Sequence, residues 1–461
     1  MNPLPLSRIA QWTNGKLRRC GLAGDVLIDA VATDTRTLDA SDGRAALFIA
    51  LKGENFDGND HVAAAAEQGA RAALVAREID IDLPQIVVAN TERALASFAA
   101  AMQHGRSGKV IGITGSNGKT TVKQLLASIL SRVGPTYVNP GNRNNEIGLP
   151  LAVIDAPDAA RFAVYEMGAG KFGDISYLTA VVRPVVSLVN NIAAAHLERM
   201  QSLLGIADTK AAIYDALPLE GIAVINADDA FAPYFEQRAP GRRIIRYGIE
   251  ASADVTARAI RQDDSAMHFV LVTPQGEVDV ALPLQGRHNV CNALAAASLA
   301  LAVDAPLADI REGLNASAPV KGRLVRHRLG NGATLIDDSY NANPGSLAAA
   351  IDTLAAVSGR NWIALGDMRE LGDDAVALHV EAGRHARAAG IGRLLTLGPL
   401  SAAAAEGFGQ GALHFETHDE LIDFLRVELH SGIRVLVKGS RGSAMDRIVN
   451  ALLPTGDIDA A

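Results

Sequence analysis

The sequence predicts an α/β protein with three domains: a small N-terminal α/β module, a central α/β domain with a nucleotide-binding phosphate loop, and a C-terminal Rossmann-like, doubly wound sheet. The chain has 461 residues, enough for about three domains. An apolar run, a glycine-containing turn and a helical pattern follow one another around residues 109–126. From about residue 316, short apolar runs alternate with helical patterns. We expect domains over residues 1–84, 85–315 and 316–461.

Composition excludes several classes of protein. Hydrophobic residues make up 49% of the chain and charged residues 20%, which favours packed cores over disorder. The net charge of −8 provides no basis for general nucleic-acid binding. Cys20 and Cys291 are the only cysteines, which argues against a disulfide framework and fits a reducing compartment. Without a signal peptide or a long apolar run, we expect a cytoplasmic monomer with no membrane span.

The N-terminal module mixes short apolar runs with turn signals. Residues 62–75 predict one alanine-rich helix followed by a strand. The string Asp34-Thr35-Arg36 and the stretch 47–61 allow two interpretations. One is a hairpin with a charged loop, and the other is an anion site built from Arg36, Lys52 and backbone amides.

The stretch 109–126, KVIGITGSNGKTTVKQLL, predicts a strand, a phosphate-binding loop and a helix. Glycines let the backbone N–H groups point at phosphate oxygens, Lys119 can reach the β and γ phosphates, and the Thr120 hydroxyl can bind Mg²⁺. The common pattern has a further glycine where this chain has Ile113. A glycine turn with a surface lysine is the alternative. The candidate ATP-binding residues of this loop are Gly115, Ser116, Asn117, Gly118, Lys119, Thr120 and Thr121.

Residues 137–150, YVNPGNRNNEIGLP, contain too much Asn, Gly and Pro for a helix or a central strand. The loop gathers the polar residues Asn142, Asn144, Asn145 and Glu146, which favours a role in gating substrate over packing. We therefore treat Asn142, Asn145 and Glu146 as candidate substrate-binding residues.

Two polar side chains follow predicted buried strands. Glu166 ends the apolar run 162–165, where phosphate-loop enzymes place a Mg²⁺ ligand, although a structural salt bridge is an alternative. His196 lies on a polar turn after the run 185–190, and a surface position competes with a metal role. Lys210 lies in a helical stretch and, by itself, predicts only a solvated side chain.

The stretch from Gly286 to Leu301 begins with polar groups and continues as an alanine-rich helix. Asn289 and Asn292 are three residues apart and can share one helix face. Either amide can hydrogen-bond an adenine edge, but helix capping is the commoner use of such residues.

In the C-terminal part, polar strings follow three predicted strands: residues 337–344, 366–372 and 438–442. Ligands of doubly wound sheets bind beyond the carboxyl ends of the strands. Each string by itself fits a connecting loop. Together, with their amides, carboxylates and basic groups, they predict a site.

Several strings in register resemble the Mur ligase family, the ATP-dependent amide-bond-forming enzymes that build the peptidoglycan stem peptide. They are TGSNGKTT, NRNNEIGLP, YEMGAG, NNIAAAHLERM, HNVCNALAA and KGR. Further strings resemble one branch of the family, which joins D-alanyl-D-alanine to UDP-N-acetylmuramoyl-tripeptide. They are DTRTL with LFIALKGENFDGNDH near the start, and DDSYNANPGS, LGDMRELGDDA and VKGSRG near the end. The family's own phosphate loop also has the shortened form seen here.

The resemblance implies roles for individual residues. Lys119 and Thr120 hold the nucleotide phosphates and Mg²⁺, Glu166 and His196 complete metal binding, and Lys210 corresponds to a lysine that is carbamylated in relatives. Asn289 and Asn292 approach adenine, and Arg323 and Asp338 contact the nucleotide from the third domain. Thr35, Arg36 and the region of Phe48 hold the UDP end of the substrate. The residues implied around the dipeptide are Asn341, Asn343, Asp367, Lys438 and Arg441.

The implied reaction passes through an acyl phosphate and gives ADP, phosphate and UDP-N-acetylmuramoyl-pentapeptide. A sister ligase that adds the diamino acid at the preceding step is one alternative, but its Asp-Asn-Pro-Arg-like string is absent. A folylpolyglutamate synthetase-like enzyme shares the central domain, but it is not expected to begin with a module that contains DTRTL and FIALKG. A nucleotide-dependent binding switch is an alternative of a different class.

Overall fold

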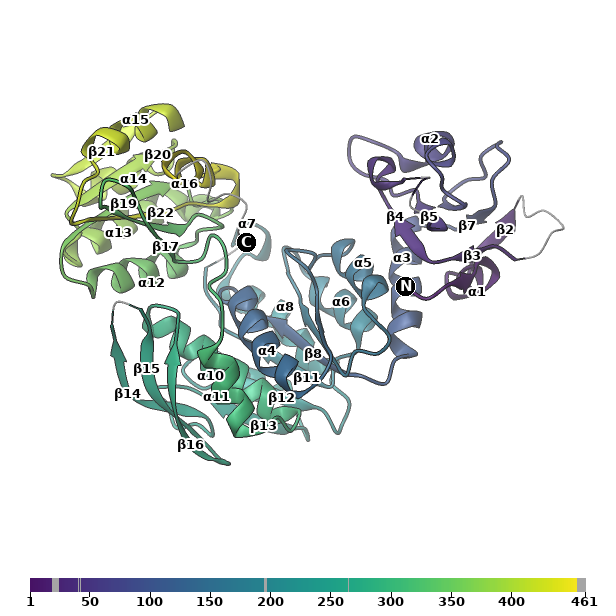
Figure 1. The fold of residues 1–461 in the computed structure, drawn as a ribbon, viewed down its shortest axis with the longest axis horizontal. Helices are drawn as coiled ribbons and strands as arrows, with labels where there is room; N and C mark the ends of the chain where they lie inside the picture. The colour runs from purple at the N-terminus through teal and green to yellow at the C-terminus, as the bar shows by residue number, and fades with distance from the viewer. Residues whose placement is uncertain (19–24, 40, 42, 195–196, 264, 454–461) are drawn as a thin grey trace.

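The structure is a computed structural model that describes residues 1–18, 25–39, 41, 43–194, 197–263 and 265–453. Figure 1 shows three bodies, with the N-terminal and C-terminal ones on opposite sides of the central one. Each body is built on its own predominantly parallel sheet. This arrangement confirms the predicted three-domain α/β fold.

The first body contains a five-stranded sheet in the order β2-β7-β6-β5-β4 and a two-stranded sheet of β1 and β3. The sheet extends to β7, so residues 85–87 pair with this first body. The predicted boundary at residue 84 stays a prediction. The elements are β1 Leu4–Pro5, α1 Leu6–Trp12, β2 Lys16–Arg18, β3 Leu27–Ile28, β4 Ala30–Ala32, β5 Ala46–Ile49, α2 Val62–Glu67, β6 Ala72–Val75 and β7 Gln85–Val87.

Helix α3 (Thr91–His104) links the first body to the second. Asn90 caps the helix by accepting a hydrogen bond from the backbone N–H of Arg93. Leu95 and Phe98 are fully buried in an apolar core that also contains Leu6 of the first body and Val153 of the second. The two bodies therefore share one core.

The central sheet has six parallel strands in the order β13-β12-β11-β8-β10-β9. Helices cover both faces, which explains why the central strands are largely apolar. The elements are β8 Lys109–Thr114, α4 Lys119–Val133, β9 Thr136–Val138, α5 Gly148–Asp155, β10 Phe162–Glu166, α6 Asp174–Val182, β11 Val186–Val189, α7 Leu197–Met200, α8 Leu203–Asp215, β12 Ile222–Asn226, α9 Ala232–Gln237, β13 Arg243–Tyr247, α10 Arg287–Ala302 and α11 Leu307–Asn315.

An antiparallel sheet of β14 (Thr256–Gln262), β15 (Met267–Thr273) and β16 (Gly276–Leu282) is inserted before α10. Its inner face joins the core under α10 and α11. The interpretation of residues 137–150 as one loop is wrong at both ends, because Tyr137 and Val138 belong to the edge strand β9 and Gly148 begins helix α5. Proline is tolerated there because the first turn of a helix needs no intrahelical N–H partner.

The third body has the strand order β17-β18-β22-β19-β20-β21, in which only β17 runs antiparallel to its neighbour. Its elements are β17 Val325–Arg328, β18 Thr334–Asp338, α12 Pro344–Ala355, β19 Arg360–Gly366, α13 Ala375–Ala388, β20 Arg393–Leu397, α14 Ala402–Phe408, β21 Ala412–Phe415, α15 His418–Glu428, β22 Ile433–Lys438 and α16 Asp446–Leu452.

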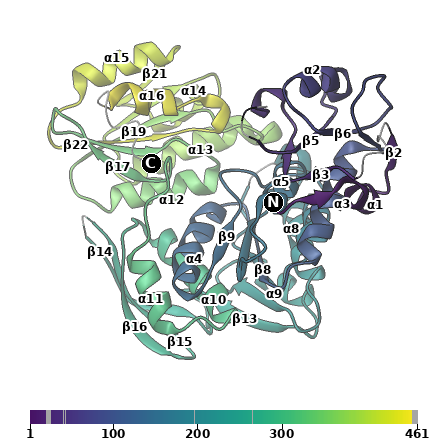
Figure 2. The same ribbon diagram turned by 45° about the vertical axis from the view of Figure 1, so that its right-hand side comes forward.

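Strand β22 shows why this sheet must be covered on both faces. Val435 and Val437 pack with α15 and α16, whereas Leu436 between them packs with α12 and α13. Side chains alternate between the two faces, and all three are fully buried. Figure 2 shows this third body above the central one. Within the described part of the chain, no helix combines the length and apolar character needed to cross a membrane.

Candidate active site

A cavity of about 720 Å³ lies where the carboxyl ends of the central strands face the third body. Parallel strands place their carboxyl ends at one edge of a sheet, and the loops that follow β8, β10 and β11 all line this cavity. The third body supplies the opposite wall. The cavity therefore brings together residues from distant parts of the chain, including the segments 116–121, 144–146, 168–171, 190–193, 288–292, 322–324 and 338–346.

The phosphate loop adopts a conformation that requires glycine. Gly115 and Gly118 have φ of +147° and +78°, values that other residues rarely adopt. A Cβ atom on Gly118 would lie 2.4 Å from Oδ1 of Asn292. No side chain caps the N-terminus of α4 within the described residues, so its first N–H groups stay available for an anion. The Lys119 ammonium group folds over the loop and donates to the carbonyl oxygen of Gly115 at 2.7 Å.

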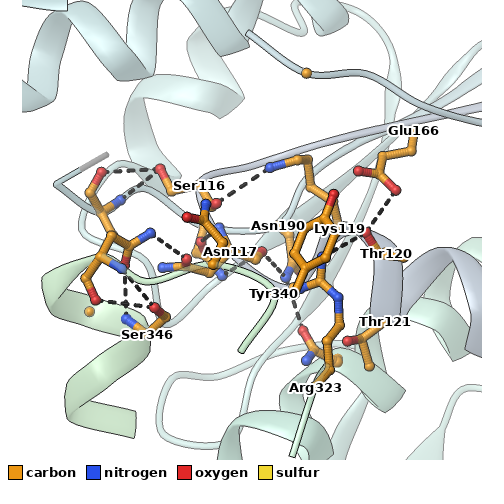
Figure 3. Close-up of a pocket in the computed structure, with 18 of the residues that line it drawn as sticks. Ser116, Asn117, Lys119, Thr120, Thr121, Glu166, Asn190, Arg323, Tyr340 and Ser346 are labelled. Carbon is orange, nitrogen blue, oxygen red and sulfur yellow. Dashed lines mark hydrogen bonds between the residues drawn. The ribbon is translucent and has the colours of Figure 1, made fainter. Parts of the chain in front are cut away.

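The carboxylate of Glu166 is buried beside the loop and held by three side chains (Figure 3 shows it facing Thr120). The Thr120 hydroxyl donates to its Oε2 at 2.9 Å, and the Asn144 amide donates to its Oε1 at 2.9 Å. The Lys123 ammonium lies 3.2 Å from Oε2. Burial raises the pKa of Glu166, but the charges of Lys123 and Lys119 and these hydrogen bonds outweigh burial, so the pKa lies below its usual value. Glu166 therefore stays ionised.

These residues fit Mg²⁺. The Thr120 hydroxyl in the first turn of α4 and the Glu166 carboxylate at the end of β10 are hard oxygen donors, the ligand type that Mg²⁺ prefers. Within the described residues no cluster of three or more His, Cys, Asp or Glu side chains forms a metal cage. The Mg²⁺ site of a nucleotide enzyme usually combines one or two protein oxygens with phosphates and water. His196 lies outside the described residues.

Lys210 on α8 is 2% exposed. Among the described residues, none forms a hydrogen bond or ion pair with its ammonium group. Burial and the charge of Lys119 place the pKa of Lys210 well below its usual value, although Asp174 acts in the opposite direction. Burial therefore favours the neutral amine over the charged ammonium. The surface position that the sequence pattern predicts for Lys210 is wrong, because α8 is covered by the central sheet and α6.

Asn289 and Asn292 do share one face of α10, as their spacing predicts. The Asn292 amide donates to Oδ1 of Asn289 at 3.0 Å, and Asn190 donates to Oδ1 of Asn292 at 3.0 Å. The Asn289 amide donates to the carbonyl oxygen of Gln285 at 2.7 Å. Both asparagines line the cavity and are held in fixed orientations by this chain of hydrogen bonds.

Residues of the third body reach the phosphate loop directly. The Arg323 guanidinium donates to the Thr120 hydroxyl at 3.0 Å, and the Asn343 amide donates to Oδ1 of Asn117 at 2.7 Å. Lys438 pairs with Asp338 at 2.5 Å, and both side chains are nearly buried in the cavity wall. These contacts join the two bodies across the cavity.

Comparison with known proteins identifies the family. Models described as "Mur ligase family, catalytic domain", "Mur ligase middle domain" and "Mur ligase, glutamate ligase domain" match residues 29–105, 113–300 and 322–441. The chain is 42% identical to the UDP-N-acetylmuramoyl-tripeptide--D-alanyl-D-alanine ligase of Escherichia coli (strain K12), over 99% of this chain and 100% of the relative. The chain belongs to the Mur ligase family.

Other relatives of this Mur ligase agree. The enzyme of the same name from Haemophilus influenzae is 37% identical over 94% of this chain and 95% of its own length. The crystal structure of MurF from Acinetobacter baumannii superposes with a TM-score of 0.92 and 34% identity, covering 98% of this chain and 99% of that one. Both the sequence and the three-body fold therefore match this family along almost the whole chain.

Several predicted residues of this Mur ligase lie away from the cavity. Arg36 pairs with Asp34 at 2.6 Å in the first body next to Thr35, and Phe48 is buried in the apolar core there. Asn142 is exposed and does not line the cavity, unlike Asn145 and Glu146. The roles of these residues stay predictions.

Two residues predicted near the dipeptide have other partners in the third body. The Asp367 carboxylate accepts hydrogen bonds from the backbone N–H groups of Leu400 and Ser401 at 3.1 and 2.8 Å. The Arg441 guanidinium lies 3.4 Å from Asp446. Neither lines the cavity, whereas Asn341, Asn343 and Lys438 do. The predicted roles of Asp367 and Arg441 are untested.

Sequence reasoning missed Lys123. Its side chain is 1% exposed, and besides facing Glu166 it donates to the carbonyl oxygens of Asn139 and Gly141 at 2.8 and 3.2 Å. The available signal was its position, four residues after Lys119 and three after Thr120, on the same face of α4. A lysine at that place inside a buried helix face requires a buried anion.

We expect Lys123→Met to reduce the free energy of unfolding by about 3–5 kcal/mol, because the substitution leaves the buried Glu166 carboxylate without its cation. Adding Glu166→Gln should restore much of this loss, because no buried charge then remains unpaired. Urea unfolding followed by circular dichroism measures both effects.

Lys171→Met is the matched control. Its ammonium lies 3.7 Å from Glu146, but the lysine side chain is 64% exposed, so we expect a change below about 0.5 kcal/mol. Equal losses in the two lysine variants, or a double variant less stable than Lys123→Met, would show that Glu166 does not depend on Lys123.

Proposed function

We propose that the protein joins D-alanyl-D-alanine to UDP-N-acetylmuramoyl-tripeptide with cleavage of ATP to ADP and phosphate. The product is UDP-N-acetylmuramoyl-pentapeptide, a precursor of peptidoglycan. The 42% identity to the Escherichia coli ligase of that name over 99% of the chain carries this proposal. The cavity between the phosphate loop and the third body supports it, because it can hold a nucleotide together with a second substrate.

The reaction has to activate a carboxylate, which is a poor electrophile at neutral pH. Transfer of the γ-phosphoryl group to the terminal carboxylate of the tripeptide gives an acyl phosphate and ADP. The neutral amine of the dipeptide then attacks the acyl carbon, and the tetrahedral intermediate loses a proton from its nitrogen and releases phosphate to give the amide. Two anions approach each other in the first step, so positive charge near the transferred group is the main requirement.

The chain provides this positive charge at the phosphate loop. In the proposal, the N–H groups of Gly118 and of the first turn of α4 bind phosphate oxygens, and Lys119 turns from the carbonyl oxygen of Gly115 to the β and γ phosphates. Thr120 and Glu166 would hold Mg²⁺, with His196 as a further ligand. Mg²⁺ would neutralise charge on the phosphoryl group and on the attacking carboxylate.

The other residues would bind and orient the substrates. Asn289 and Asn292 would hydrogen-bond adenine, while Arg323 and Asp338 would contact the nucleotide from the third domain. That domain would close over the nucleotide and exclude water, which protects the acyl phosphate from hydrolysis. We propose domains over residues 1–84, 85–315 and 316–461. In this division the first domain binds the UDP end of the substrate, the second domain binds ATP, and the third domain binds the dipeptide. We further propose that the enzyme is monomeric and cytoplasmic.

The remaining substrate contacts are proposed on resemblance. The UDP end would be bound by the first domain, and Asn142, Asn145 and Glu146 would gate the substrate. The residues proposed for UDP are Thr35, Arg36 and Phe48, and those for the dipeptide are Asn341, Asn343, Asp367, Lys438 and Arg441.

Phosphate release from ATP tests the function. Purified protein with Mg²⁺ receives UDP-N-acetylmuramoyl-tripeptide and D-alanyl-D-alanine separately and together. Release only with both substrates, with the mass of the UDP-linked pentapeptide, is the expected result. Release that requires a free diamino acid and a UDP-linked dipeptide would instead identify the sister ligase. Release without either substrate would identify a nucleotide-dependent switch.

We expect Lys119→Ala to lower turnover by at least about 10³-fold, because the transferred phosphoryl group loses its nearest side-chain cation. Lys109→Ala is the matched control. Lys109 begins the strand that leads into the loop, and its exposed ammonium pairs with Asp304 at 3.0 Å. The control should keep full activity, and both variants should have the circular dichroism spectrum of the wild type. Wild-type turnover in Lys119→Ala would remove the assignment of the phosphate loop.

We also propose that Lys210 is carbamylated. A carbamate forms when a neutral amine adds to CO₂ and loses a proton, and the burial of Lys210, which lowers its pKa, favours the neutral amine. The resulting anion would orient a second Mg²⁺. With ¹³C-bicarbonate, we expect a carbamate ¹³C resonance that disappears in Lys210→Met and persists in Lys109→Met. A spectrum without this resonance in the wild type would contradict the proposal.

A further inference from the structure

The linker that carries Arg323 is attached to the third body. The backbone N–H of Gly322 donates to the Asp337 carboxylate at 3.1 Å, and its carbonyl oxygen accepts from the N–H of Tyr340 at 3.2 Å. Gly322 has a φ of +73°, and a Cβ atom there would lie 3.1 Å from Cβ of Tyr340. Only glycine allows this close approach without strain. Arg323 therefore moves with the third body.

The ring of Tyr340 lies against the Arg323 guanidinium, whose central carbon is 4.6 Å from the ring centroid. The same guanidinium donates to the Thr120 hydroxyl at 3.0 Å across the domain junction. Figure 3 shows Tyr340, Arg323 and Thr120 together at one side of the cavity. An arginine side chain has several rotatable bonds, and stacking on an aromatic face removes much of this freedom.

The surroundings explain why the guanidinium needs such a restraint. Its charge acts on Lys119 and on Asp338, which already pairs with Lys438 at 2.5 Å. An unrestrained guanidinium would also be attracted toward the carboxylate of Asp338. The aromatic face holds it at the loop without introducing a second negative charge, which would repel phosphate.

We infer that Tyr340 is a positioning residue: its ring holds the Arg323 guanidinium toward the phosphate loop, so that the third domain delivers an oriented cation to the nucleotide phosphates. The inference rests on the proposed function in that it requires nucleotide to bind beside Thr120. Among the described residues, none hydrogen-bonds to the Tyr340 hydroxyl. The ring itself, which phenylalanine also provides, is therefore the part that acts.

Binding of the non-hydrolysable ATP analogue AMP-PNP with Mg²⁺, measured by isothermal titration calorimetry on the full-length protein, tests the inference. Tyr340→Leu should raise the Kd by about 3- to 30-fold, the range that a cation–π contact provides. Tyr340→Phe should stay within about 2-fold of the wild type. In an Arg323→Met background, Tyr340→Leu should cause no further loss, because its effect passes through Arg323.

Each alternative outcome overturns the inference in a recognisable way. An equal loss from Tyr340→Leu with and without Arg323 would show that Tyr340 contacts the nucleotide itself. A loss in Tyr340→Phe equal to that in Tyr340→Leu would assign the effect to the hydroxyl. An unchanged Kd in Tyr340→Leu, or a raised KM for D-alanyl-D-alanine alone, would remove the link to the nucleotide.

Two controls separate this result from other failures. Failure of the wild type to bind AMP-PNP would contradict the proposed function, and with it the nucleotide site on which the inference depends. Trp362 is buried in the core of the third domain, so unchanged fluorescence of Trp362 in a Trp12→Phe background verifies that each variant folds. A Tyr340→Leu variant that alters this fluorescence while Tyr340→Phe binds normally would assign Tyr340 to folding and overturn the inference.

Discussion

The buried negative charge of Glu166 is the constraint on which the arrangement of the site depends. A carboxylate removed from water is stable only when cations and donors surround it, and here Lys123, Thr120 and Asn144 do so. The side-chain amide of Asn139 also forms two hydrogen bonds with the backbone of Glu166. Its oxygen accepts from the N–H of Glu166 at 2.9 Å, and its nitrogen donates to the carbonyl oxygen of Glu166 at 3.1 Å. Helix α4, strand β10 and the loop after β9 are thereby held in one geometry, which positions the phosphate loop relative to the sheet.

The junction between the central and third domains is held by hydrogen bonds between polar groups and not by a shared apolar core. Hydrogen bonds cross it, including Arg323 with Thr120, Asn343 with Asn117, and the N–H of Glu198 with the carbonyl oxygen of Glu370 at 3.5 Å. Within the described chain, the apolar clusters of the third body lie entirely after residue 323, and those of the rest end by residue 314. Polar junctions separate at little cost because water replaces the lost hydrogen bonds. This suits a domain that opens and closes on a nucleotide.

The sequence predicted the elements whose signal is local. The strand, loop and helix of residues 109–126 and the alternation after residue 316 are regular patterns, and both were confirmed. The antiparallel sheet of β14 to β16 was not predicted, because its alternating polarity depends on packing against α10 and α11, which is a tertiary feature.

The burial of side chains in the site also could not be predicted from local sequence patterns. Lys210 and Lys123 look like surface residues in the sequence, because no local pattern shows that other elements cover them. The position of Asn289 and Asn292 on one helix face was predictable, because helical spacing alone determines it. The contacts of Arg323 with Thr120 and Tyr340 depend on how two domains meet, which the sequence pattern does not encode.

Helix α3 determines which parts of the chain can fold together during synthesis. Because α3 buries Leu95 and Phe98 in a core shared by the first two sheets, those sheets form one cooperative unit. The third sheet has its own cores on both faces and shares none of that unit's apolar contacts in the described chain. During synthesis, the first 315 residues therefore emerge with every apolar partner they need. The nucleotide-binding half of the site can form on the ribosome before the residues that cover it have been translated.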